Sequence, residues 1–209
     1  MSGVETVEEM LELILIRHGE CDANRERSYI GWHDSPLTPS GVATTVALRS
    51  VLPVPDAVHT SDLGRALKSA GLAFPDIEVR GDARLRELDF GIFEGATYDE
   101  NVMRHGERFR AWIEDPWNVR PDGGETLGEL SLRIDSWLAS VMEEYRALWV
   151  ARPDRPPLII AFTHGGVIRT IAARALGIRY QDVHGMVRPC EALRFTVADD
   201  GTLSLLEPA

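Results

Sequence analysis

The sequence predicts an α/β fold built around a parallel sheet that is buried on both faces. Residues 11–16 and 157–162 are short, β-prone and mostly apolar, which is typical of strands covered on both sides. Each run precedes a histidine and a glycine, His18-Gly19 and His164-Gly165, and an apolar-periodic helix follows over residues 167–176. Ligands of open α/β sheets bind outside the carboxyl ends of the strands, so we expect the two histidines to meet in one site.

Capping residues and turns predict the remaining elements. Thr38-Pro39 indicates a helix that runs to about residue 50, and Ser61-Asp62 indicates another that runs to about residue 70. Weak strands are expected over residues 57–59 and 77–79. Residues 191–197 and 202–206 are expected to form a closing hairpin around Asp199-Asp200-Gly201.

Residues 91–157 differ in character from the rest of the chain. They contain four of the five tryptophans, a Pro121-Asp122-Gly123-Gly124 turn and a long amphipathic pattern over residues 126–150. We interpret this segment as a helical insertion over the strand ends, a lid or side wall within a single domain that spans residues 1–209.

Composition limits the classes of function. The 209 residues are 44% hydrophobic, enough for one ordinary domain, and the two cysteines predict a reducing, cytoplasmic setting. No targeting or membrane-spanning segment is expected. The formal net charge of -11 argues against nucleic acid and anionic membranes as partners. Lys68 is the only lysine, which leaves little material for Walker-type nucleotide binding or Schiff-base chemistry. The sequence does not determine the oligomeric state.

The most informative motif is Arg17-His18-Gly19-Glu20, directly after the first predicted strand. Thr163-His164-Gly165-Gly166 repeats the setting, and glycine beside each histidine allows the backbone to approach an oxyanion. Arg65 lies in the first turn of a predicted helix, where its guanidinium could grip phosphate oxygens together with Arg17. Glu87 lies between apolar neighbours, where burial could turn it into a proton donor.

Together the motifs resemble the histidine phosphatase superfamily, which includes cofactor-dependent phosphoglycerate mutases, fructose-2,6-bisphosphatases and α-ribazole phosphatases. The resemblance covers nearly the whole chain. Its motifs are Arg17-His18-Gly19-Glu20, Asn24, Gly31-Trp32-His33-Asp34-Ser35-Pro36-Leu37-Thr38, Ser61-Asp62-Leu63-Gly64-Arg65-Ala66, Leu85-Arg86-Glu87, Gly91-Ile92-Phe93-Glu94-Gly95, Gly123-Gly124-Glu125 and His164-Gly165-Gly166.

The resemblance implies a three-layer α/β/α sandwich with a mostly parallel sheet. It also implies that His18 carries the phosphoryl group and that Glu87 is the proton donor. The phosphate pocket would be completed by Arg17, Arg65 and His164, and the substrate would lie near Asn24, the backbone of Ile30 and Gly31, and Gly165.

The chain departs from the family pattern at two positions. The family usually has threonine or serine after the first motif, where this chain has Cys21, and often has arginine where this chain has Ser28. We expect Arg25 or Arg27 to replace that arginine in holding the substrate.

These residue types suit hydrolysis of a phosphate monoester without a metal or other cofactor. His18 can attack through one ring nitrogen if the other donates to a carbonyl group, and Arg17, Arg65 and a protonated His164 would hold the phosphate oxygens. Glu87 could serve both half-reactions, and Glu94 is the competing carboxylate, with positioning as its favoured role.

Three other mechanisms are weaker. Cys21 and Arg27 have the spacing of a cysteine-based phosphatase, but the loop between them lacks glycine and carries Asp22 and Glu26. The histidines show no paired metal-ligand spacing; His33, His59 and His105 are expected on the surface or in loops, and His184 could border the site. A non-catalytic phosphate-binding scaffold is the third alternative.

Within the family, a phosphoglycerate mutase-type phosphoryl transfer is the alternative to hydrolysis. Residues 90–98, Phe-Gly-Ile-Phe-Glu-Gly-Ala-Thr-Tyr, resemble the broad phosphatase branch, and the proline-rich insert that mutases usually carry after this region is missing. We therefore expect a phosphatase that acts on a small phosphorylated metabolite, whose identity the sequence does not reveal.

Overall fold

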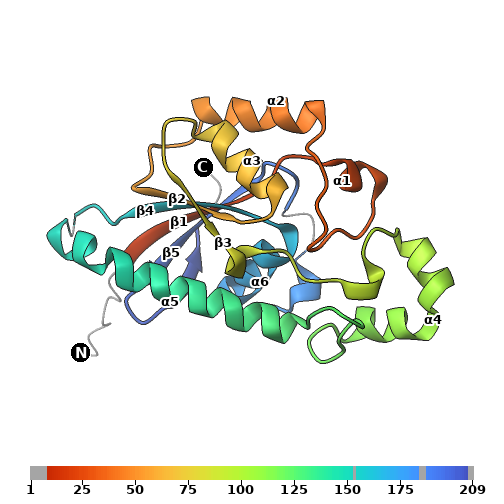
Figure 1. Cartoon of the computed structure of the whole chain (residues 1–209). Coiled ribbons are helices and arrows are strands. Elements are labelled where there is room, and N and C mark those ends of the chain that lie inside the picture. The colour runs from red at the N-terminus through yellow and green to blue at the C-terminus, as the bar shows by residue number, and fades with distance from the viewer. Residues whose placement is uncertain (1–8, 153, 184–186, 207–209) are drawn as a thin grey trace, which may run out of the picture.

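The computed structural model describes residues 9–152, 154–183 and 187–206 (Figure 1). Its strands are β1 (Glu9–Arg17), β2 (Ala57–Ser61), β3 (Val79–Asp82), β4 (Leu158–Thr163), β5 (Ala192–Ala198) and β6 (Leu203–Leu205). Its α-helices are α1 (Asp22–Glu26), α2 (Pro39–Ala47), α3 (Gly64–Ala73), α4 (Tyr98–Glu114), α5 (Leu127–Ala151) and α6 (Gly165–Leu176). Four 3-10 turns, η1 (Leu48–Ser50), η2 (Ala83–Leu85), η3 (Gly91–Phe93) and η4 (Tyr180–Asp182), complete the described elements.

The strands form one mixed sheet in the order β3-β2-β4-β1-β5-β6. Strands β3, β2, β4 and β1 run parallel to one another, while β5 runs antiparallel to β1 and β6 antiparallel to β5. The predicted α/β sandwich with a mostly parallel sheet is confirmed, and the predicted closing hairpin supplies its antiparallel edge.

Alternate residues of the central strands face two separate hydrophobic cores. In β1, Leu13 and Leu15 contribute to the core beneath α5 and α6, whereas Ile14 and Ile16 contribute to the core on the α3 side. Figure 1 shows α2 and α3 on one side of the sheet and α5 and α6 on the other. A strand must be apolar at every position to be buried on both faces, which explains the unbroken apolar runs.

Helix boundaries follow the capping chemistry with one exception. At the start of α2, the Thr38 side chain accepts a hydrogen bond from Gly41 N–H, and a proline occupies the first turn. At the start of α5, Thr126 forms a capping box. The predicted cap at Ser61 is wrong, because Ser61 ends β2 and α3 begins only at Gly64. Its hydroxyl instead accepts a hydrogen bond from Leu63 N–H at 3.3 Å.

Residues 91–157 supply both a wall at the strand ends and a layer of the sandwich. Helix α4 stands beyond the carboxyl ends of the parallel strands, where Figure 1 shows it beside α1. Gly106, with a φ of 51°, interrupts its helical geometry. Helix α5 instead runs along the sheet, and its Trp137 is fully buried in the core. No helix in the described part of the chain is long and apolar enough to cross a membrane.

The two faces of α5 give a matched test of this packing. Leu130 is fully buried and Leu132 is 69% exposed on the same helix. We expect Leu130→Ala to lower the free energy of unfolding by about 2–5 kcal/mol through the cavity it leaves. Leu132→Ala should change it by less than about 0.5 kcal/mol. Urea unfolding of both variants measures the difference; equal losses would show that α5 is not a core helix.

Candidate active site

The pairing of β1 with β4 brings the two histidines together. Arg17 is opposite Thr163 in the parallel register, so His18 and His164 follow at the same edge of the sheet. Their rings lie 5.1 Å apart between centroids in an edge-on arrangement, and both side chains are almost completely buried. The meeting predicted from the two strand ends is what the structure shows.

Hydrogen bonds fix the tautomer of His18. Its Nδ1 lies 2.7 Å from the carbonyl oxygen of Gly19, a group that can only accept, so Nδ1 carries the proton. Its Nε2 accepts a hydrogen bond from Arg65 Nε at 3.3 Å. The unprotonated nitrogen of His18 is therefore Nε2, which meets the expectation of a carbonyl-oriented imidazole.

Both buried imidazoles are neutral. Burial lowers the pKa of His18 well below 6.5, and the positive charges of Arg65 and Arg17 lower it further. Burial also lowers the pKa of His164 well below 6.5, with further lowering by Arg65, His18 and Arg17. Without a bound phosphate His164 is therefore neutral and offers one N–H donor, and its protonation beside a bound phosphate stays a prediction.

Arg65 is anchored beneath the site by backbone carbonyl groups. It is 1% exposed, and its Nη atoms donate to the carbonyl oxygens of His33 at 2.8 Å and Gly31 at 2.6 Å, with a longer contact to Ile30. Burial lowers the pKa of Arg65, but the guanidinium stays charged at neutral pH. The predicted Ile30-Gly31 backbone therefore lies at the site, where it orients Arg65.

Arg17 and Glu87 approach each other across Gly165. Arg17 Nη1 donates to the Val187 carbonyl at 2.8 Å, and its buried Nε has no hydrogen-bond partner among the described residues. A Cβ atom on Gly165 would lie 3.7 Å from the Arg17 guanidinium carbon and 3.8 Å from Glu87 Oε2. The glycine thus leaves room for an oxyanion beside both side chains.

The Glu87 carboxylate lies at the start of α6. Both of its oxygens accept from Gly166 N–H at 3.0 Å, and Oε1 also accepts from Leu88 N–H at 2.9 Å. A Cβ atom on Gly166 would come within 2.2 Å of Oε1, so only glycine allows this approach. Because Oε1 receives two donors, Oε2 is the oxygen with a lone pair for a transferable proton.

Arg133 is a supporting residue that the sequence analysis missed. From α5 it donates to the carbonyl oxygens of Arg84 and Arg86 and, at 2.9 Å, to that of Glu87. It also pairs with Glu125. The Gly123-Gly124-Glu125 motif was the available signal, but it did not reveal that Glu125 and Arg133 together hold the segment that carries Glu87.

Glu94 has the positioning role favoured for it over catalysis. Its buried carboxylate accepts from Gly31 N–H and Trp32 N–H, both at 2.9 Å, and from Phe90 N–H at 3.3 Å. These contacts tie the loop that binds Arg65 to the loop that follows Glu87.

The loop after the first motif contains both positions at which the chain departs from the family pattern, Cys21 and Ser28. Cys21 is fully buried, its Sγ donates to Asn24 Oδ1 at 3.1 Å within the turn that begins α1, and it lines neither of the pockets described below. This placement weighs against the cysteine-phosphatase mechanism. Arg25 pairs with Asp22 in solvent, whereas Arg27 lines the cleft beside Asn24. That Arg27 holds the substrate in place of the missing arginine stays a prediction.

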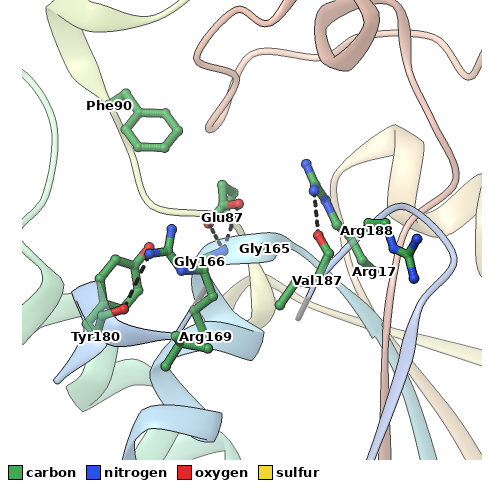
Figure 2. Close-up of a pocket in the computed structure, with 10 residues that line it drawn as sticks. Arg17, Glu87, Phe90, Gly165, Gly166, Arg169, Tyr180, Val187 and Arg188 are labelled. Atoms are coloured by element: carbon green, nitrogen blue, oxygen red, sulfur yellow. Dashed lines mark hydrogen bonds between the residues drawn. The ribbon is translucent and has the colours of Figure 1, made fainter. Parts of the chain in front are cut away.

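Two adjoining pockets open above these buried groups. The first, of about 350 Å³, and the second, of about 460 Å³, share Arg17, Glu87 and Phe90. Figure 2 shows Glu87 between Arg17 on one side and Arg169 and Tyr180 on the other. Arg169, Tyr180 and Arg188 are lining residues that the sequence did not predict, since they belong to none of its motifs. Phe90 begins the 90–98 motif, but its place in the pocket was not predicted either.

The other histidines differ from expectation at one position. His33 is exposed as expected, and His105, which is partly exposed on α4, packs against Phe93. His59 is not on the surface or in a loop: it lies in β2, is 6% exposed and has Trp137 Nε1 at 3.4 Å from its Nδ1. His184 lies outside the described residues. No group of three or more potential metal ligands occurs in residues 9–152, 154–183 and 187–206.

The model of the histidine phosphatase superfamily (branch 1) matches residues 13–206 of this chain. A probable phosphoglycerate mutase, GpmB, of Klebsiella pneumoniae is 34% identical over 194 residues, which cover 88% of this chain and 84% of that protein. The crystal structure of the α-ribazole phosphatase from Shigella flexneri superposes with a TM-score of 0.80 at 26% identity and covers 94% of this chain and 95% of that one. A mycobacterial glucosyl-3-phosphoglycerate phosphatase bound to VO3 gives a TM-score of 0.78 at 28% identity, with 94% and 96% covered.

The lowered pKa values of His18 and His164 give a prediction that does not depend on the substrate. Between pH 8 and 5.5 the imidazole NMR signals of both residues should keep the positions of the neutral form, while the urea-unfolded chain titrates near 6.5. The unfolded chain then binds protons that the native state does not, so the free energy of unfolding should fall as the pH drops below about 6.5.

Signals are assigned from their loss in His18→Gln and His164→Gln, and each variant should show a shallower fall in stability with pH. A native-state midpoint at or above 6.5 for either histidine would contradict the prediction.

Proposed function

The chain belongs to the histidine phosphatase superfamily, and from that membership and the geometry of its site we propose that it is a phosphomonoesterase that works through a phosphohistidine at His18. Its substrate is a small phosphorylated metabolite, and neither nucleic acid nor a membrane is a partner. The two pockets suit a small metabolite, and the acidic net charge disfavours the larger partners. Both cysteines are free thiols, which supports a reducing, cytoplasmic setting.

The observation that carries the proposal is the state of His18. A phosphoryl acceptor needs an unprotonated nitrogen. The Gly19 carbonyl fixes the single proton on Nδ1, while burial and the charges of Arg65 and Arg17 lower the pKa of His18, so Nε2 stays unprotonated. Nε2 also meets Arg65 Nε–H, a donor suited to phosphate oxygens. We infer that an incoming phosphate replaces His18 as the partner of Arg65 Nε and so frees Nε2 to attack.

The reaction has two balanced steps. In the first, Nε2 of His18 forms a bond to phosphorus as the ester P–O bond breaks, and Glu87 Oε2 gives its proton to the leaving oxygen. In the second, water attacks phosphohistidine, Glu87 takes a proton from that water, and inorganic phosphate leaves with His18 restored. The same carboxyl group thus returns to its starting state.

The site supplies the cations that such a reaction needs. Arg17 and the first turn of α6 adjoin the space beside Gly165, Arg65 contacts His18 Nε2, and His164 can add one N–H. The proposed hydrolysis therefore requires no metal ion.

Phosphoryl transfer to a second alcohol is the alternative, favoured by the names of relatives such as the probable phosphoglycerate mutase. The missing proline-rich insert supports hydrolysis. Measured products separate the two: hydrolysis gives one inorganic phosphate per alcohol, whereas a mutase with 3-phosphoglycerate yields its 2-phospho isomer. A binding scaffold would give neither product.

We expect the covalent intermediate to form on His18 and not on Cys21. With a nitrophenyl phosphate ester in EDTA, the intact enzyme should release phosphate, and rapid quenching should trap an acid-labile, alkali-stable phosphoryl group. Cys21→Ser should keep most of the activity, because a serine hydroxyl can replace the thiol as donor to Asn24 Oδ1. His18→Ala should lose it. Activity that disappears in Cys21→Ser but persists in His18→Ala, or that EDTA abolishes, would contradict this mechanism.

Glu87→Gln should reveal the proton donor through its dependence on the leaving group. An alkyl alkoxide must be protonated to leave, so turnover of an alkyl phosphate should fall about a hundredfold or more. Nitrophenolate leaves without a proton, so the burst of nitrophenol that accompanies phosphorylation of His18 should change far less. The burst is compared because Glu87 also activates the hydrolytic water.

Glu94→Gln is the control. It weakens the contacts to the backbone N–H groups of the loops, and should therefore affect both substrates alike. If Glu94→Gln showed the leaving-group dependence and Glu87→Gln did not, the proton donor would be Glu94.

A further inference from the structure

A third pocket opens beside the catalytic cleft and has mostly aromatic and apolar walls. Its volume is about 320 Å³. It shares Phe90, Arg169 and Tyr180 with the first catalytic pocket, of about 350 Å³, and Tyr29 and Phe90 with the second, of about 460 Å³. We call it the aromatic pocket; its walls include Tyr29, Phe90, Trp112, Ile113, Arg169 and Tyr180. Figure 2 shows Phe90, Arg169 and Tyr180 on the same side of Glu87, opposite Arg17.

Contacts between the rings hold the walls in place. Tyr29 meets Phe90 and Trp112 edge-on, at centroid distances of 5.2 and 5.7 Å, and Phe90 meets Trp112 at 5.7 Å. The guanidinium of Arg169 lies 4.3 Å from the centre of the Tyr180 ring. Such a surface is suited to a flat ligand with exposed ring faces.

Two of the lining side chains carry buried donors without a partner. Trp112 is only 5% exposed, and neither its Nε1–H nor the buried Nε–H of Arg169 has a hydrogen-bond partner within the described part of the chain. Burying a donor unpaired is costly, so native structures rarely leave one without a function. Two such donors in an aromatic pocket indicate a ligand that is flat and also carries acceptor atoms.

Charge in the pocket is consistent with such a ligand. Arg169 forms no ion pair with the described acidic residues, and its only hydrogen bond there is the 3.3 Å contact to the Tyr180 carbonyl. Burial raises the pKa of Tyr180 to about 12, so its phenol stays neutral. The walls thus offer donors and ring faces, and no negative charge to repel electron-rich ring atoms.

We propose that the aromatic pocket binds a planar heteroaromatic group with hydrogen-bond acceptors, carried by the alcohol portion of the substrate. The proposal rests on the proposed function, because it places the phosphate beside Arg17 and directs the leaving group past Glu87 toward Arg169. Both donors are buried behind the pocket wall in this structure, so on binding the Trp112 and Arg169 side chains turn to let Nε1–H and Nε–H donate to the heterocycle. The neighbouring rings pack against its faces.

The test compares esters that share a reacting oxygen. Ribose 5-phosphate and the 5′-monophosphates of uridine and adenosine all lose a primary 5′-alcohol, but only the nucleotides carry a heterocycle. We expect kcat/KM about tenfold or more higher for at least one nucleotide than for ribose 5-phosphate, within the range for stacking of a base on an aromatic side chain.

Two variants connect this preference to the pocket. Trp112→Phe keeps an aromatic wall and removes one donor, so the preference should fall about fivefold, as expected for one hydrogen bond. Ile113→Trp adds bulk at a wall residue that is 39% exposed, so the preference should disappear while ribose 5-phosphate turnover stays within about twofold. Thermal unfolding shows whether either variant remains folded.

Binding measured without turnover separates this proposal from the proposed function. Uridine 5′-monophosphate should quench the tryptophan fluorescence of the intact protein, Trp112→Phe should remove most of the quench, and ribose 5-phosphate should cause none. Quenching without phosphate release from any ester would overturn the proposed function and leave the pocket assigned. Equal turnover of all three esters with no quenching would overturn the pocket proposal alone.

An anion-binding pocket is the remaining outcome. If the nucleotides show no advantage, and Arg169→Gln lowers turnover of 3-phosphoglycerate but not that of glycerol 3-phosphate, then Arg169 recognises a carboxylate and the heteroaromatic proposal is overturned.

Discussion

The parallel register of β1 and β4 is the constraint on which the site depends. Because Arg17 lies opposite Thr163, the residues that follow both strands, His18 and His164, leave the sheet at the same edge. Thr163 then donates its hydroxyl to the Leu85 carbonyl at 2.7 Å, which anchors the segment leading to Glu87. A shift of one residue would turn every side chain of the strand to the opposite face, and both cores would be lost.

Burial of the cationic groups gives the site its chemical character. Taking Arg65 out of water is costly, and the carbonyl oxygens of Ile30, Gly31 and His33 offset part of that cost. The same dry surroundings make protonation of His18 unfavourable, so one environment keeps a guanidinium charged and an imidazole neutral. The pair works because their intrinsic basicities differ by many orders of magnitude.

Much of this arrangement was predictable from the sequence, because motifs at strand ends follow from topology. The apolar runs predicted the central strands, and the residues after them predicted His18 and His164. Thr38 predicted the start of α2 and the amphipathic pattern over residues 126–150 predicted α5, whereas Ser61 failed because its strand extended two residues further than expected. Arg133, Arg169 and Trp112 could not be found this way, since their roles arise from packing between helices and loops that are distant in sequence. His59 was misjudged for a related reason: only the placement of α5 over β2 buries it.

The interruption of α4 at Gly106 divides the helix into two halves that border different pockets. Tyr98, before the break, borders the pocket that contains Asn24, while Trp112 and Ile113, after it, border the aromatic pocket. A continuous helix would carry any displacement at one end through to the other. With the glycine between the two halves, natural substitutions can change the shape of one pocket wall without moving the other. Substrate preference can therefore change in one pocket at a time while the catalytic residues stay the same.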